Sequence, residues 1–199
     1  MNSRVSGYLE RDVMKIEPPR RIATGAVVLR ELRADDASAY TRAFKEDRDL
    51  GRLLGMERDP SEDRVRQRCA QLPERALAGE FVELVVADPA SDELQETVNL
   101  HSFAWQHRRC EVGFWLSTAA RGRGLGAAAV AAMIEWAFST LGLLRIEMTT
   151  TPDNVAVPAL ARRLGFTLEG VARKRNVERG RRIDVVSYGL LREEWRSRS

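Results

Sequence analysis

A glycine-rich stretch at residues 121–126 has the composition of a site that holds a phosphate group. It reads Arg121-Gly122-Arg123-Gly124-Leu125-Gly126 and lies between an apolar run at 111–116 and a long alanine-rich segment. Glycine lets the backbone take positive φ and approach a ligand, and the start of a following helix adds unpaired N–H donors and the positive end of its dipole. The stretch therefore indicates an anion-binding turn, although a tight strand-to-helix turn without a ligand can have the same composition.

Two other kinds of phosphate loop fit this stretch less well. A Walker A loop needs Lys-Ser or Lys-Thr after its last glycine, whereas here Ala127 follows. The dinucleotide fingerprint is matched in its permissive form by Gly122, Gly124 and Ala127, with Glu147 as the candidate ribose ligand. However, the stretch lies past the middle of the chain, and too little sequence follows it to build the remaining βαβ units of a dinucleotide domain.

A third match is closer. The pattern Arg-x-x-Gly-x-Gly between a strand and a helix resembles the acetyl-CoA pyrophosphate loop of the Gcn5-related N-acetyltransferase (GNAT) superfamily. Further along the chain, Asn154, Leu160 and Gly165-Phe166 resemble the second cofactor segment of that superfamily. The resemblance covers nearly the whole chain from about Val27 onward.

The C-terminal part resembles the RimJ/RimL-type branch of the superfamily, which acetylates ribosomal proteins. The features that carry this resemblance are Glu169-Gly170, a basic hairpin, and the ending Tyr188-x-Leu190-Leu191-x-x-Glu194-Trp195. One position departs from the branch. Where the branch often has Ser three residues after the Asn, this chain has Val157, so no side-chain hydroxyl at that position can protonate the departing CoA thiolate.

The resemblance implies an acyltransferase that moves an acetyl group from acetyl-CoA to an amine by direct attack in a ternary complex, with no metal. It also implies a strand that splays from its neighbour before the glycine loop, so that unpaired backbone groups bind pantetheine and thioester. An ordinary buried strand would have the same sequence. The cofactor-binding residues implied are Phe114, Trp115, Leu116, Arg121, Gly122, Arg123, Gly124, Leu125, Gly126 and Asn154, the last of which can also serve as a helix cap.

Amine acetylation needs a group that takes a proton from an ammonium, because free amines are mostly protonated at neutral pH. Alternation along the strand places Glu111, Gly113 and Trp115 on one face, which makes Glu111 the first candidate base. His101 on the partner strand is the second candidate. Either residue can also be an ordinary solvated or hydrogen-bonded side chain.

Composition limits the class of protein. The 199 residues, 44% of them hydrophobic, suffice for one domain with a sizeable core. No long uncharged apolar run or signal core is present, so we expect a cytoplasmic protein without a membrane span. Cys69 and Cys110 form no metal-ligand spacing with the histidines and are expected to be buried, reduced thiols rather than a disulfide or a nucleophile. The net charge of +3 suits a CoA ligand, and without an RNA- or DNA-binding motif it does not indicate nucleic acid.

Periodicity predicts alternating strands and helices after an N-terminal extension at 1–25. We expect strands at 27–32, 81–87, 97–103, 111–116, 144–149, 167–176 and 182–191. The expected helices are 34–48, 127–141, one from 152–154 to Gly165, and one that runs from a cap at 59–61 to about Leu72. In this last helix Pro73 is expected to cause an interruption, after which a final turn ends near Gly79. Residues 26–199 are thus expected to form one α/β (α+β) GNAT domain with a mixed, mostly antiparallel seven-stranded sheet, splayed central strands and flanking helices.

The most favoured function is N-acetylation of a protein or peptide N-terminus. The alternatives are acetylation of a small-molecule amine such as an antibiotic or polyamine, and a CoA-binding regulatory module without turnover. The expected partners are acetyl-CoA and the amine acceptor, and a homodimer is left open.

Overall fold

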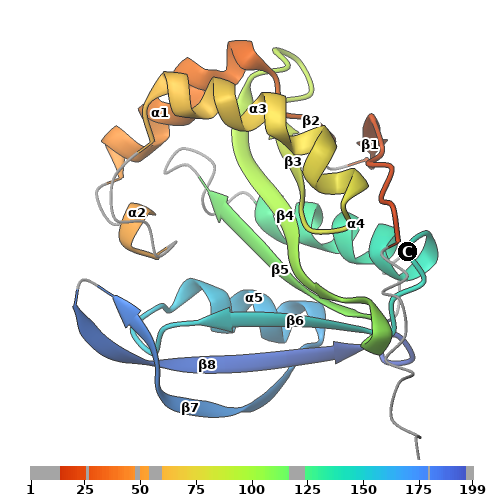
Figure 1. Cartoon of the computed structure of the whole chain (residues 1–199), viewed down its shortest axis with the longest axis vertical. Coiled ribbons are helices and arrows are strands. Elements are labelled where there is room, and N and C mark those ends of the chain that lie inside the picture. Colours follow the sequence, from red (N-terminus) through yellow and green to blue (C-terminus); the bar gives the residue numbers. More distant parts are fainter. Residues whose placement is uncertain are drawn as a thin grey trace, which may run out of the picture.

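The protein forms one sheet in the strand order β1-β2-β3-β4-β5-β6-β8-β7 (Figure 1). The computed structural model describes residues 14–25, 27–47, 50–53, 60–116, 124–178 and 180–195. Neighbouring strands are antiparallel except β5 and β6, which run parallel. The strands are β1 Arg21–Ala23, β2 Val28–Glu31, β3 Val82–Ala87, β4 Leu94–Ala104, β5 Arg109–Leu116, β6 Arg145–Thr150, β7 Thr167–Glu178 and β8 Arg181–Leu191.

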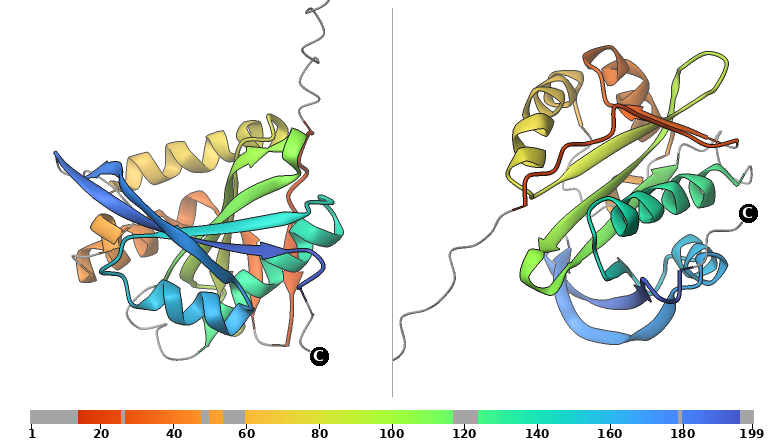
Figure 2. Two further views of the ribbon diagram at one scale, coloured as in Figure 1. Left: turned by 90° about the horizontal axis from the view of Figure 1, so that it is seen from below. Right: turned by 90° about the vertical axis from the view of Figure 1, so that its right-hand side faces the viewer.

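Helices cover both faces of the sheet (Figures 1 and 2). On one face, Tyr40 and Phe44 of α1 pack with Trp115 of β5. On the other face, Met133 of α4 packs in a core that includes Val98 of β4. The helical segments are η1 Ala34–Asp36, α1 Ala37–Glu46, α2 Leu50–Leu53, α3 Glu62–Leu77, η2 Trp105–His107, α4 Leu125–Ser139 and α5 Ala156–Leu164. The expected mixed, mostly antiparallel single-domain fold is confirmed.

Local sequence explains where several helices begin and end. Ser61 caps α3, because its hydroxyl accepts a hydrogen bond from the Arg64 amide at 3.4 Å. Gly165 ends α5 in the left-handed region, with φ of 87°, where glycine carries no Cβ penalty. Helix α4 is apolar around most of its circumference and is correspondingly buried along most of its length.

The sheet has eight strands in the described part of the chain, and the sequence analysis predicted seven. The additional strand is β1, which pairs with β2 from within the segment that was predicted to be an N-terminal extension. Ile16 of the same segment is fully buried, and its amide donates to the carbonyl of Ala76 at 3.1 Å. Three residues of weak periodicity are too short to reveal a strand, because their pairing is set by β2 rather than by their own pattern.

The predicted interruption of the second helix at Pro73 is wrong, since α3 continues through it to Leu77, close to the predicted end of the last turn near Gly79. Proline removes one helical hydrogen bond and normally bends or ends a helix. Here the residues after Pro73 are held by contacts with the sheet. Ala76 is buried, and the guanidinium of Arg75 lies 4.4 Å from the centre of the Phe81 ring.

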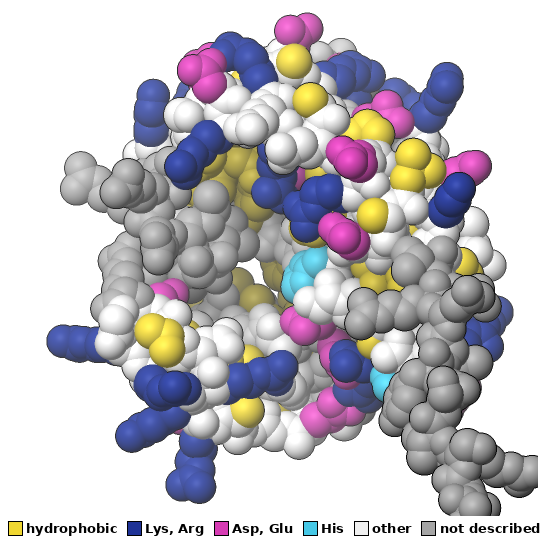
Figure 3. Space-filling model, in the orientation of Figure 1, with side chains coloured by type: hydrophobic (Ala, Val, Ile, Leu, Met, Phe, Trp, Pro, Cys, Tyr) yellow, Lys and Arg dark blue, Asp and Glu magenta, His cyan; other side chains and the backbone are white. Residues whose placement is uncertain are grey.

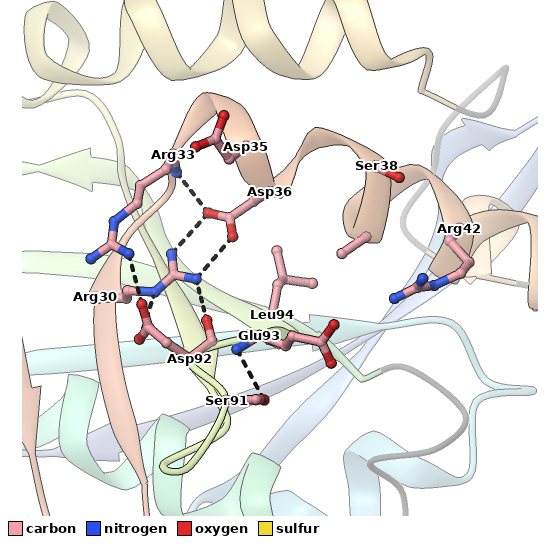
Figure 4. Close-up of a pocket in the computed structure, with 11 residues that line it drawn as sticks. Arg30, Arg33, Asp35, Asp36, Ser38, Arg42, Ser91, Asp92, Glu93 and Leu94 are labelled. Atoms are coloured by element: carbon pink, nitrogen blue, oxygen red, sulfur yellow. Dashed lines mark hydrogen bonds and ion pairs between the residues drawn. The ribbon is translucent and has the colours of Figure 1, made fainter.

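A buried ion pair fixes the start of α1 on the sheet (Figure 4). Arg30 of β2 donates from both terminal nitrogens to the two carboxylate oxygens of Asp36, each at 2.8 Å. Arg30 also donates to Asp92 in the β3–β4 turn, at 3.2 Å to the carboxylate and 2.7 Å to the carbonyl. The Arg30 side chain is 3% exposed and that of Asp36 is 9% exposed. Three segments far apart in sequence are therefore joined by one guanidinium.

We predict that Arg30→Met lowers the free energy of unfolding by about 3–5 kcal/mol, because it leaves the Asp36 carboxylate buried without its partner. Urea denaturation measures this loss. The matched control is Arg33→Ala, which breaks an exposed ion pair with Asp92 and should cost about 0–1 kcal/mol. Losses of similar size in the two variants would show that the buried pair does not anchor α1.

Candidate active site

Strands β5 and β6 separate after a short parallel contact. They pair only at Arg109–Glu111 with Arg145–Glu147, whereas β5 stays paired with β4 as far as Leu116. From Val112 to Leu116, the backbone groups that point towards β6 have no strand partner in the described part of the chain. The predicted splay is therefore present. Figure 3 shows a hollow in this face of the molecule.

The predicted cofactor residues Phe114, Trp115 and Leu116 lie on the splayed segment of β5. Phe114 packs against the core beneath α4. Trp115 faces the other way and is 4% exposed, with its ring 5.2 Å from that of Tyr40 and 5.5 Å from that of Phe44. Since both side chains are occupied by packing, this segment offers a ligand its backbone N–H and carbonyl groups.

The end of the glycine-rich stretch forms the start of α4. Gly124 precedes the helix in the left-handed region, with φ of 78°, and Leu125 and Gly126 form its first turn. The first amides of a helix have no partners within the helix, and the helix dipole favours an anion in front of them. The other predicted residues of the loop, Arg121, Gly122 and Arg123, lie outside the described residues.

A basic side chain that the sequence analysis did not select lies beside this turn. The terminal nitrogens of Arg163, in α5, lie 3.7 and 3.8 Å from the position that a Cβ on Gly124 would occupy. Arg163 was overlooked because α5 carries two arginines in its last turn, and only the packing of α5 against α4 decides which one approaches the loop. The turn at Gly124 thus has both the amides of the first turn of α4 and at least one guanidinium beside it.

The two candidate bases, Glu111 and His101, are direct neighbours across β5 and β4. One Glu111 oxygen accepts a hydrogen bond from the Thr149 hydroxyl at 3.1 Å. His101 Nδ1 lies 2.9 Å from the Ser102 hydroxyl. Burial lowers the pKa of His101 below its ordinary value of 6.5, and the nearby Glu111 carboxylate opposes this only in part. The imidazole is therefore mostly neutral at pH 7.

Gly113 lies beneath two polar side chains on the same face. A Cβ at this position would lie 2.8 Å from Asn99 Oδ1 and 3.3 Å from His101 Nε2. Both atoms therefore stand directly over the β5 backbone, and a side chain at Gly113 would displace them. Asn99 Oδ1 is buried and has no hydrogen-bond partner among the described residues. Together these atoms form a polar floor on the α1 and α3 side of the sheet.

Asn154 acts as a helix cap. Its Oδ1 accepts hydrogen bonds from the amides of Ala156 and Val157 at 3.0 and 3.2 Å. This fixes the side chain at the start of α5 and leaves its amide nitrogen without a partner in the described structure. Val157, which stands at the position of the branch's Ser, is 9% exposed and packs in the core below α4.

Three other reactive groups lie in or near the core. Cys110 and Glu96 are buried, whereas Cys69, which was also expected to be buried, is half-buried. Cys69 and Cys110 are free thiols, and burial raises the pKa of both, which disfavours the thiolate needed for a nucleophile. Glu96 lies opposite Leu116 and is fully buried, with neither oxygen hydrogen-bonded in the described part of the chain. Burial raises the pKa of Glu96 to about 8, so its carboxyl is mostly protonated at neutral pH.

Among the described residues, no group of three or more His, Cys, Asp or Glu side chains could hold a metal ion. The described helices include none that is long and apolar enough to cross a membrane.

Comparison with known proteins agrees with this geometry. The family described as "Acetyltransferase (GNAT) domain" matches residues 26–167. The chain is 25% identical over 172 residues to "Uncharacterized N-acetyltransferase p20" of Bacillus licheniformis, which covers 86% of this chain and 96% of that protein. It is 34% identical over 98 residues to "Putative ribosomal N-acetyltransferase YdaF" of Bacillus subtilis, which covers 49% of this chain and 54% of that protein.

A solved structure has the same fold. "Mycobacterium smegmatis RimJ in complex with CoA-disulfide" superposes with a TM-score of 0.77 at 23% identity, over 84% of this chain and 83% of that one. The chain belongs to the GNAT acetyltransferases. It is accordingly an acyltransferase of the N-acetyltransferase type, as the sequence resemblance implied.

We predict that Gly124→Val weakens acetyl-CoA binding by about tenfold or more, equivalent to about 1.4 kcal/mol. A side chain in the left-handed region costs roughly 1–2 kcal/mol, so the turn should shift and its amides should move away from the phosphates. Isothermal titration calorimetry measures the affinity.

The matched control is Gly180→Val, because Gly180 has a similar φ of 75° but lies in the β7–β8 turn. The control should retain wild-type affinity. Unchanged affinity in Gly124→Val would show that this turn does not hold the cofactor.

Proposed function

We propose that this acyltransferase transfers an acetyl group from acetyl-CoA to the primary amine of a protein or peptide N-terminus, by direct attack in a ternary complex. The observation that carries the proposal is the splay between β5 and β6. It leaves backbone groups unpaired between the turn at Gly124 and the polar floor, where His101 has Glu111 as its neighbour. Cofactor and acceptor can thus approach one opening from two sides of the sheet.

The residues around the splay fit acetyl-CoA. The free backbone groups of residues 112–116 would bind the pantetheine amides and the thioester carbonyl. The amides at the start of α4 would hold the pyrophosphate, and Arg163 would add a charge-assisted contact to a phosphate. When bound, acetyl-CoA supplies the activated acetyl group, and the protein's task is to hold the amine beside it and to remove a proton.

We assign proton removal to Glu111, supported by His101. Thr149 fixes one oxygen of Glu111, and the other, which has no hydrogen-bond partner among the described residues, would accept from an ammonium. His101 is held in its neutral form, with Nε2 over the backbone of Gly113, and can orient the amine or take the proton in turn. Val157 offers no hydroxyl, so the departing thiolate would take its proton from water.

The charges near the floor favour a peptide terminus over a polyamine. Of the nearby carboxylates, Glu83 is already paired with Arg68, and Glu111 remains to face an incoming ammonium. A polycation would meet the guanidiniums of Arg68 and Arg75 without an acidic cluster to bind it. A peptide terminus carries a single ammonium. The partial similarity to YdaF, whose name describes a ribosomal N-acetyltransferase, supports the same choice.

An amine panel tests the proposal. Purified protein is incubated with acetyl-CoA and with peptides that have free N-termini, the same peptides with blocked N-termini and a free lysine, polyamines, and aminoglycosides. CoA release and product mass are recorded. Acetylation should occur at free peptide N-termini, and transfer confined to the polyamines or aminoglycosides would contradict the proposal. The cytoplasmic location and the homodimer stay predictions from sequence.

We predict that Glu111→Gln lowers kcat by about 10²–10⁴-fold at pH 7 while acetyl-CoA affinity stays near that of the wild type. The loss should shrink at high pH, where the amine deprotonates without help. A steady-state pH profile measures both effects. Full activity of Glu111→Gln at pH 7 would exclude this role for Glu111.

His101→Gln is the companion variant. Because the pKa of His101 is lowered, the imidazole stays neutral at pH 7, and activity that depends on it is lost only below the ordinary value of 6.5. The pH profile of kcat is measured for both proteins. If the wild-type activity falls below pH 6.5 and this fall is absent in His101→Gln, the base is His101 rather than Glu111.

A further inference from the structure

Arg68 of α3 is held in place by a fully buried carboxylate. Its Nε donates to Glu83 Oε2 at 2.6 Å, and the Glu83 side chain is only 1% exposed. The other Glu83 oxygen accepts the Thr97 hydroxyl at 3.0 Å. Both oxygens of Glu83 are therefore occupied, and Arg68 contributes a single N–H group, at Nε, to one of them.

The two terminal nitrogens of Arg68 have no hydrogen-bond partner among the described residues, and the side chain is 36% exposed. The guanidinium lies over the Phe81 ring, 5.0 Å from its centre, which limits its orientation further. Arg75 lies over the same ring, and the described residues give it no ion pair. Two cations thus lie over one aromatic ring, and only Arg68 is paired with a carboxylate, so this cluster has an excess positive charge. A fixed guanidinium with free terminal N–H groups suits a carboxylate.

The strand register places this cluster beside the candidate bases. Glu83 pairs with Asn99 on β4, and Asn99 pairs with Gly113 on β5. His101 and Glu111 lie two residues further along these strands on the same face. The distance from Glu83 to Gly113 is two interstrand spacings, about 10 Å. Figure 3 shows Lys and Arg side chains at the border of the hollow, in the region below α3.

We propose that Arg68 is a specificity-determining residue that binds a carboxylate close to the acceptor amine. The inference rests on the proposed function and deepens it. An extended peptide spans about 3.3–3.6 Å per residue, so a terminus with its amine over Gly113 brings the side chain of residue two or three within reach of Arg68. The unpartnered Asn99 Oδ1 lies between the two groups and can accept an N–H from the terminus. The acceptor class is therefore a peptide N-terminus with Asp or Glu at its second or third position.

Matched peptides test this assignment. Pairs that differ only by Glu or Gln at position two, and again at position three, are compared by kcat/KM. The wild type should prefer Glu over Gln by about tenfold at one of these positions, the size expected for one charge-assisted hydrogen bond. Added salt should reduce the preference. Amidated and free C-termini are compared in short peptides, so that a preference arising from a terminal carboxylate is distinguished from a side-chain preference.

The decisive measurement is the ratio of kcat/KM for the Glu peptide to kcat/KM for the Gln peptide in each variant. This ratio does not change when a fraction of the protein molecules is unfolded. Arg68→Met should bring the ratio to about one, and Arg68→Lys, which keeps the charge but loses the paired N–H groups, should give an intermediate ratio. The control is Arg66→Met, since Arg66 also lies on α3 but pairs with Glu62 and Asp63 on its exposed side. The control should keep the wild-type ratio.

The outcomes distinguish a failure of the proposed function from a failure of the role assigned to Arg68. If none of the peptides is acetylated, the proposed function fails. If peptides are acetylated without a preference for Glu, or if the preference survives in Arg68→Met, the function stands and the role of Arg68 is overturned. A preference that follows the C-terminal carboxylate alone would overturn the side-chain assignment and point to a free amino acid or dipeptide as acceptor.

Discussion

Strand β5 lies between β4 and β6, which diverge, and only its pairing with β4 continues to its last residue. Its last residues stay with β4, where Trp115 is fixed beneath α1 by Tyr40 and Phe44. Strand β6 pairs along its full length with β8 and leaves β5 after Glu111. Unpaired backbone groups in a half-buried position carry a free-energy cost unless a ligand or water satisfies them. We therefore propose that the opening binds a ligand with amide and carbonyl groups of its own.

The two faces of the sheet differ in what they offer around this opening. On the α4 side, Gly124, the first helical turn and Arg163 provide donors and positive charge. On the α1 and α3 side, both oxygens of Glu83 are bound by Arg68 and Thr97, whereas Glu111 has one oxygen without a hydrogen-bond partner among the described residues. In the proposed function, this arrangement gives the cofactor and the acceptor separate approaches. The buried pair of Arg30 and Asp36 contributes indirectly, because it holds α1 on the sheet and so fixes the wall that packs on Trp115.

Patterns that are local in sequence predicted the order of most elements and the faces of single strands. Alternation in 111–116 placed Glu111 and Gly113 on one face, and the structure shows this together with the neighbouring His101. Features that depend on a contact with a residue far away in the sequence could not be predicted. Pairing of Arg68 with Glu83 depends on how α3 lies over β3, and β1 depends on β2. Glu96 has an ordinary sequence context, and only its place between β3 and β5 leaves its carboxyl buried.

The central claim is that the splay of β5 from β6 is the cofactor site, and a crystal structure of the protein with acetyl-CoA tests it most directly. The account predicts that the pantetheine arm lies between the two strands, with its amides and the thioester carbonyl hydrogen-bonded to the backbone of residues 112–116. The pyrophosphate should lie at the start of α4 beside Gly124. Acetyl-CoA bound elsewhere, or β5 and β6 paired as far as residue 116 in the complex, would contradict it.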